Sequence, residues 1–128
     1  MNEPVWVRLD VALALHQQQL VEFGGPEGVR DPGLLESAMA RPKNLFAYSE
    51  PTLGQMAAAY AKGIVANHPF VDGNKRTAFV VSLTFLRLNG LDLNATQEDR
   101  YQVFLGLAAG TLSEEALAQW FDRNAVPR

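Results

Sequence analysis

The sequence predicts an all-α fold, a single compact helical domain of residues 1–128 around one buried central helix. Runs of apolar residues at helical spacing recur along the chain, and all but the last end at a glycine or a proline. One of them, residues 78–88, is polar only at Ser82, Thr84 and Arg87. A helix that is apolar nearly all round is one enclosed by other helices. Strand-like sequence is confined to a short piece near the N-terminus, so helices must form the core.

Two helices are expected in the first third of the chain. The first runs from an N-cap at Asp10 to about Phe23, where a pair of glycines ends it. The second begins with Asp31 as N-cap and Pro32 as first residue. It stops before Pro42, because the residue preceding a proline is disfavoured in the α region.

His16 lies inside the first predicted helix. No residue close to it in the sequence offers a partner for a shared metal ion. We therefore interpret it as a surface or half-buried helix histidine.

The segment from Lys43 to Pro51 has no helical period. It can be an ordinary connecting loop, which the composition favours, or it can contain a short extended flap. The flap would consist of Leu45, Phe46, Ala47 and Tyr48.

The middle of the chain contains a third helix and the central one. Thr52 can cap a helix over residues 53–67, which is rich in small residues that allow close helix packing. Pro69 ends it and leaves His68 at or just past its C-terminus. The central helix begins at residue 74 or 75 and ends at Leu88.

Two more helices are expected after a short linker at residues 91–94. Thr96 opens one that runs to about Ala109, before a glycine. Thr111 and Glu114 have the spacing of a capping box and open the last helix, which includes Phe121.

Composition excludes several classes of protein. The formal net charge is −3, so no global basic field for nucleic acid exists and any anion site must be built locally. The sequence contains no cysteine, which excludes a disulfide framework and fits a reducing cytoplasm. No apolar run reaches the roughly 18 residues needed to span a bilayer, so we expect a cytoplasmic protein without a membrane partner.

The N-terminus of the central helix carries the wrong charges unless an anion binds there. Gly73 precedes it, and Lys75 and Arg76 stand in its first turn. A cation at this end interacts unfavourably with the helix dipole, at a cost of about 0.3–1 kcal/mol. An anion such as a polyphosphate would be attracted by the dipole, by both cations and by the free N–H groups of the first turn.

The residues beside this turn add the groups needed for phosphate-ester chemistry. Asp72 can bind Mg²⁺, which prefers one or two carboxylates together with phosphate oxygens. Asn74 can donate to a phosphate oxygen, and the His68 imidazole can accept a proton from a hydroxyl near neutral pH. Simple capping of two helices by His68 and Asp72 explains less of the pattern. A P-loop is excluded, because its pattern needs two glycines flanking four residues directly before the lysine, whereas Gly73 stands alone in this stretch and a helix precedes it.

Residues 68–76, His-Pro-Phe-Val-Asp-Gly-Asn-Lys-Arg, resemble the Fic family motif, His-x-Phe-x-(Asp/Glu)-Gly-Asn-Gly-Arg-x-x-Arg. Lys75 replaces the second glycine, and Phe79 stands in the place of the second arginine. Both departures are similar to the death-on-curing (Doc) branch of the family, where Asn-Lys-Arg-Thr-Ala is usual. The likeness extends over nearly the whole chain, through Gly24-Gly25, Asp31-Pro32-Gly33 and the segment from Phe85 to Gly90.

The resemblance implies a role for each matching residue. His68 would be the base that deprotonates a target hydroxyl, and Asp72 would bind Mg²⁺. Phe70 would anchor the loop in the core. The segment at residues 45–48 would be the flap that aligns the target chain. The phosphates of ATP would be held by Gly73, Asn74, Lys75 and Arg76.

The resemblance also implies a reaction and partners. Doc-like proteins transfer the γ-phosphate of ATP to a threonine of elongation factor Tu, and typical Fic enzymes transfer AMP instead. Lys75 and Phe79 favour phosphoryl transfer, with AMP transfer as the alternative and a catalytically silent binding module as a third hypothesis. The chain has no match to the inhibitory helix (Ser/Thr)-x-x-x-Glu-(Gly/Asn), which implies a separate Phd-like antitoxin acting in trans.

Overall fold

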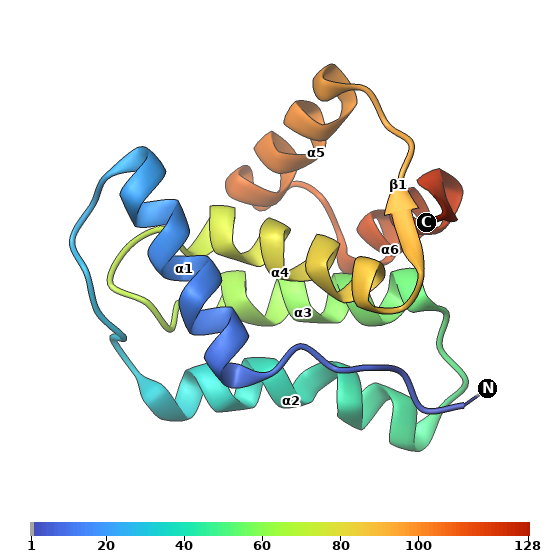
Figure 1. Ribbon diagram of the computed structural model, residues 1–128, viewed down its shortest axis with the longest axis horizontal. Helices are drawn as coiled ribbons and strands as arrows, with labels where there is room; N and C mark the ends of the chain where they lie inside the picture. The colour runs from blue at the N-terminus through green and yellow to red at the C-terminus, as the bar shows by residue number, and fades with distance from the viewer. Residues whose placement is uncertain (1) are drawn as a thin grey trace.

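The computed structural model describes residues 2–128, and this part of the chain forms a helical domain with a very small sheet (Figure 1). The predicted all-α class is confirmed. No helix in residues 2–128 combines the length and the apolar character needed to cross a membrane. The elements are α1 (Leu9–Phe23), α2 (Pro32–Tyr48), α3 (Leu53–Asn67), α4 (Asn74–Leu88), β1 (Leu91–Leu93), α5 (Gln97–Ala109), α6 (Glu114–Asn124) and β2 (Ala125–Pro127).

The helix at the centre of the domain is α3, which packs against α2, α4 and α6 (Figure 1). Its residues 56–61 are all buried. The sequence had indicated α4 as the enclosed helix, but α4 leaves one side open to solvent, including Arg87 and Leu88. The central place falls to α3 because its alanines and glycines let three helices approach at once. The α4 helix lies beside it and receives α1 on its other side.

Two glycines show how closely α3 is packed. A Cβ at Gly63 would stand 3.3 Å from the backbone of Ala38 in α2. A Cβ at Gly54 would collide with the Asp122 carboxylate of α6. That carboxylate accepts hydrogen bonds from the Gly54 amide at 3.0 Å and from the Thr52 hydroxyl at 2.6 Å. The start of α3 is therefore fastened directly to α6.

The second helix is longer than the sequence indicated. It does not stop before Pro42 but continues to Tyr48, so the predicted extended flap at residues 45–48 is wrong. Proline inside a helix removes one hydrogen bond and crowds the preceding turn. Here Pro42 is buried, and the following turn brings Phe46 onto Trp6, with ring centroids 5.9 Å apart. This burial offsets the cost of the proline.

The predicted linker at residues 91–94 contains strand β1, which pairs antiparallel with β2 so that Leu91 lies opposite Pro127. Local sequence could not reveal this strand, because its partner is at the other end of the last two helices. The pairing returns the C-terminus to the end of α4.

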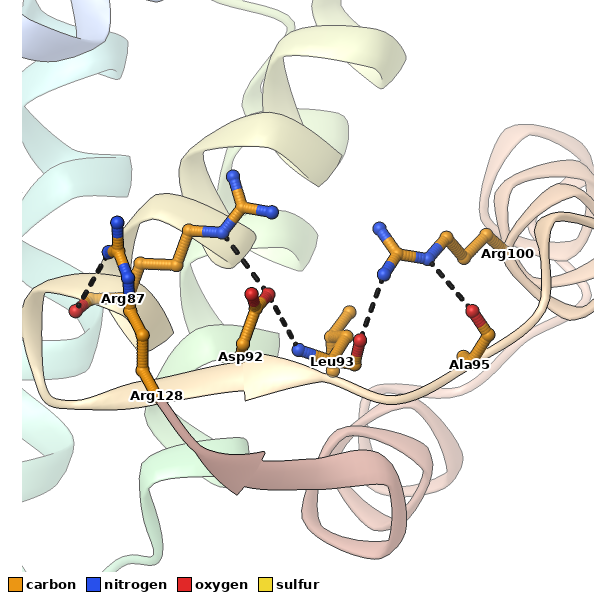
Figure 2. A network of polar contacts seen from close by, with 6 residues as sticks. All are labelled: Arg87, Asp92, Leu93, Ala95, Arg100 and Arg128. Carbon is orange, nitrogen blue, oxygen red and sulfur yellow. Dashed lines mark hydrogen bonds and ion pairs between the residues drawn. The ribbon is translucent and has the colours of Figure 1, made fainter.

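Figure 2 shows the polar contacts that hold β1 in place. The Asp92 carboxylate accepts a hydrogen bond from the Leu93 amide at 2.8 Å and one from Arg87 Nε at 3.2 Å. These contacts, the backbone one foremost, lower the pKa of Asp92. Arg100 of α5 donates to the carbonyls of Leu93 and Ala95, at 3.0 and 3.3 Å. The strand thereby joins α4 to α5.

The helix caps agree with the sequence in part. Thr52 caps α3 in a capping box with Gln55, and Thr96 caps α5. At the first helix the N-cap is Arg8 instead of Asp10, and at the last helix Ser113 takes the place expected for Thr111. Ser113 is as suitable a cap as Thr111, so propensity does not choose between them. Arg8 makes no side-chain cap hydrogen bond, and Asp10 lies in the first turn of α1, where its carboxylate pairs with Arg8.

Residues 2–8, before α1, form no strand, although the apolar sequence from Val5 to Val7 favours one. The Val7 amide donates instead to the buried Tyr60 hydroxyl of α3 at 3.1 Å. Burial raises the pKa of Tyr60 to about 12. The phenol therefore stays neutral over the physiological pH range, and its oxygen accepts the hydrogen bond from Val7.

We expect Gly54→Ala to destabilise the domain, since its new methyl group has no room between α3 and α6. The unfolding free energy in urea should fall by about 1–3 kcal/mol, the usual cost of overpacking. Gly33→Ala is the matched control, because a Cβ there meets its nearest atom at an ordinary 3.4 Å. A Gly54→Ala protein as stable as the control would contradict the packing described here.

Candidate functional site

The site is built on the loop between α3 and α4, residues 68–73. His68 ends α3 in the left-handed region, with φ 50° and ψ 54°, and its amide donates to the Ile64 carbonyl at 3.0 Å. Non-glycine residues enter this region at a steric cost, so the conformation has to be held by its surroundings. Gly73 then turns the chain into α4, with φ 76° and ψ 16°.

One cavity of about 170 Å³ collects the predicted chemistry. It is lined by the six residues that the sequence had indicated for catalysis, metal binding and phosphate binding, and by one aromatic residue from α5. Phe70 lies beneath the loop and is fully buried, as an anchor has to be. The lining residues are His68, Asp72, Gly73, Asn74, Lys75, Arg76 and Phe104.

The cavity has the character of an anion site. The backbone amides of residues 73–76 donate to no protein acceptor within residues 2–128. In the same part of the chain, neither Lys75 nor Arg76 has an acidic partner at ion-pair distance. The Arg76 guanidinium lies over the Phe23 ring at 4.3 Å, which leaves its N–H groups available in the guanidinium plane. Free donors and unpaired positive charge therefore meet at one helix N-terminus.

Asn74 has a different place from the one its sequence suggested. Its side-chain Oδ1 accepts from the Phe70 amide at 2.9 Å, and its Nδ2 donates to the Phe70 carbonyl at 3.0 Å. The side chain is 5% exposed. The Asn74 side chain, which was expected to donate to phosphate, instead closes the loop. Only the backbone amide of Asn74 remains available to an anion.

Asp72 supplies an exposed carboxylate at the edge of the cavity. No group of three or more metal-ligating side chains occurs in residues 2–128, so a cage made by the protein alone is absent from this region. A single carboxylate beside an anion site fits Mg²⁺, which completes its shell with phosphate oxygens and water. Gly25 leaves room for this carboxylate, because a Cβ there would collide with Asp72.

An extended segment beside the motif was missed from the sequence. Residues 24–31 connect α1 to α2, and Val29 forms an antiparallel bridge with Phe70. The Arg30 amide donates to the Pro69 carbonyl at 2.7 Å, and the Val71 amide donates to Gly28 at 3.0 Å. The glycines and proline of this segment had indicated only a loop, and its pairing with the motif depends on tertiary structure.

The predicted flap residues lie away from the site. Close to the motif, Asn67 at the end of α3 bonds the Leu34 carbonyl near the start of α2. Leu45 shares a different cavity with Gln55, near the opposite end of α3. A helix of this length separates its ends by about 20 Å. Leu45, Phe46, Ala47 and Tyr48 therefore do not border the cavity.

His16 was also misread from the sequence. It is only 4% exposed, and its ring stacks on the Phe70 ring with centroids 3.8 Å apart. Its Nε2 lies 2.8 Å from the Asp72 carbonyl oxygen. A carbonyl only accepts, so Nε2 carries the proton and donates it. Nothing near His16 in the sequence signals this contact, because Asp72 is 56 residues away.

Comparison with known proteins agrees with the motif. Residues 6–86 match the Fic/DOC family. The chain is 47% identical over 79 residues to "Toxin Doc" of Mycolicibacterium smegmatis, a match that covers 59% of each protein. It is 35% identical over 112 residues to "Protein kinase doc" of Escherichia phage P1, covering 87% of this chain and 88% of that protein.

We expect Asn74→Ala to lower the unfolding free energy by about 2–4 kcal/mol, since both backbone groups of Phe70 lose their partners in a buried place. Urea denaturation followed by circular dichroism measures this. Asn94→Ala is the control, because Asn94 is exposed and the change should stay within about 0.5 kcal/mol. Equal stability of the two variants would contradict the closing role of Asn74.

Proposed function

Since the chain belongs to the Fic/DOC family, we propose that it is a Doc-type toxin that transfers a phosphoryl group from ATP to a hydroxyl group of a protein. The observation that carries the proposal is the single cavity in which an imidazole, a carboxylate and the free N-terminus of α4 meet. The names of the two relatives, a toxin and a protein kinase, support the same reading.

His68 acts as the general base. It accepts the proton of a target serine or threonine hydroxyl, whose oxygen forms a bond to the γ-phosphorus while the bond to the β–γ bridging oxygen breaks and ADP leaves. The exposed side chain of His68 lines the cavity and can reach a hydroxyl presented from solvent. Its backbone is fixed, because Arg30 Nε donates to the His68 carbonyl at 2.7 Å.

The nucleotide phosphates bind at the start of α4. The amides of Gly73 and Asn74 and the charged groups of Lys75 and Arg76 neutralise the phosphate oxygens where negative charge accumulates. Asp72 holds Mg²⁺, which supplies further neutralisation of the polyphosphate. The Asn74 side chain closes the loop, and residues 74–76 form the first turn of α4, so the backbone amides are already in place before an anion binds.

Two residues favour phosphoryl transfer over AMP transfer. Lys75 puts a long charged side chain where the Fic motif has glycine, which changes the space and charge offered to the phosphates. Phe79, in the place of the second Fic arginine, packs toward Trp120 with ring centroids 6.4 Å apart. That position therefore supplies packing and no phosphate contact.

The segment at residues 24–31 aligns the target chain. It is exposed and runs beside the motif, bridged to Phe70. It thus takes over the role that the sequence had given to residues 45–48. The protein target is elongation factor Tu, and a Phd-like antitoxin restrains the enzyme in trans.

The position of a radioactive label in ATP tests the reaction type. With purified protein and a bacterial lysate, we expect transfer of label from γ-labelled ATP to one protein band of the size of elongation factor Tu, and none from α-labelled ATP. His68→Ala is the control and should abolish transfer while the far-ultraviolet circular dichroism remains unchanged, because His68 is exposed. Label from the α position would assign AMP transfer instead.

Growth tests the toxin itself. Expression of the chain alone in bacteria should arrest growth, His68→Ala should relieve the arrest, and co-expression of the small protein encoded beside it should relieve it too. Toxicity that persists with His68→Ala would point to a binding module that needs no catalysis. Unrestrained growth with active enzyme present would contradict the toxin assignment.

A further inference from the structure

We infer that His16 is a positioning residue, which fixes the orientation of the Asp72–Gly73 peptide and so directs the Gly73 amide into the anion site. The inference rests on the proposed function only in calling the ligand a nucleotide polyphosphate. The geometry of the peptide stands independently of it.

The contact joins two distant parts of the chain. His16 projects from α1, is 4% exposed, and donates from Nε2 to the Asp72 carbonyl at 2.8 Å. Its ring lies nearly parallel to Phe70, with an angle of 9° between the planes. Stacking fixes the plane of the imidazole, and the fixed plane aims Nε2 at the carbonyl. An imidazole with its proton on Nε2 can both stack on Phe70 and donate to the Asp72 carbonyl.

The direction of the carbonyl determines the direction of the next amide. The peptide bonds in residues 2–128 are all trans, and in a trans peptide the C=O and the following N–H point in opposite directions. The Asp72 carbonyl points to His16 on the α1 side. The Gly73 N–H therefore points away from α1. Gly73 lines the cavity, and its amide has no protein acceptor within the described chain.

Glycine makes an external restraint necessary. Gly73 adopts φ 76°, a region that glycine enters without steric cost, but glycine enters most other regions equally easily. The backbone of Gly73 therefore does not hold the preceding peptide by itself. In residues 2–128 the Asp72 carbonyl has no hydrogen-bond partner besides His16. Without this donor the peptide is free to rotate, and the N–H leaves the anion site.

Two substitutions separate hydrogen bonding from packing. His16→Phe keeps an aromatic ring against Phe70 but has no donor. His16→Gln loses the ring but carries an amide nitrogen at a distance from Cα similar to that of Nε2. If His16 acts only through packing, His16→Gln should lose more order at the Gly73 amide and more ligand affinity than His16→Phe. If His16 positions the peptide, His16→Phe should show the larger losses.

The first measurement needs no ligand. In ¹⁵N relaxation spectra, the Gly73 amide should be as ordered as α4 in the wild type and in His16→Gln, and clearly more mobile in His16→Phe. The second measurement is calorimetric binding of Mg²⁺ with a non-hydrolysable ATP analogue. We expect His16→Phe to bind the analogue about 10-fold or more weakly, a loss typical of mutations that remove a hydrogen bond to a ligand-binding group. The affinity of His16→Gln should be near that of the wild type. If His16→Phe fails to fold, His16→Met takes its place as the variant without a donor.

Several outcomes overturn the inference. A rigid Gly73 amide and unchanged affinity in His16→Phe would do so, as would losses in His16→Gln that equal or exceed those in His16→Phe, because they would show that the stacked ring matters at least as much as the hydrogen bond. The proposed function fails separately if the wild type does not bind the analogue. A Gly73 amide that is ordered in the wild type and mobile only in His16→Phe then still supports the positioning role.

Discussion

The burial of Phe70 is the constraint on which the site depends. Its ring is fully buried and covered by His16 from α1, while both of its backbone polar groups bond the Asn74 side chain. Its backbone also forms the bridge to Val29. A loop between two helices is usually the mobile part of a helical domain. Here contacts from three other segments converge on one residue and hold the loop still.

The two helix ends at the loop have opposite electrostatic character, and the chain treats them differently. The C-terminal end of α3 carries partial negative charge, which would repel an anion. Arg30 covers it, donating to the carbonyls of Asn67 and His68 at 2.9 and 2.7 Å. The N-terminal end of α4 remains uncovered. The neutralised end and the open end lie next to each other, so the local potential favours anions although the whole chain is acidic.

The sequence was sufficient wherever the determinants were local. The bounds of α3 and α4 followed from Thr52, Pro69 and the glycine before α4. The cavity lining followed too, except for Phe104 of α5, because its other residues are nearly contiguous. It failed where a distant partner decides. Whether the helix continues through Pro42 depends on the burial of this residue against neighbouring elements. The strand within residues 91–94 forms only because it pairs with β2 near the C-terminus. His16 and the segment at residues 24–31 reach the motif only through tertiary packing.

The separation between His16 and Asp72 has a consequence for folding. Contacts between residues far apart in sequence form late, because a long loop must close before they are made. On the ribosome, α1 emerges first. Its His16 can contact Asp72 only after the 56 residues that separate them in sequence have been added. The helix that orients the loop and the loop itself thus meet only after α2 and α3 have been synthesised. Assembly of the cavity is consequently possible only after the motif has been synthesised, and Phe104 of α5 joins its lining later still.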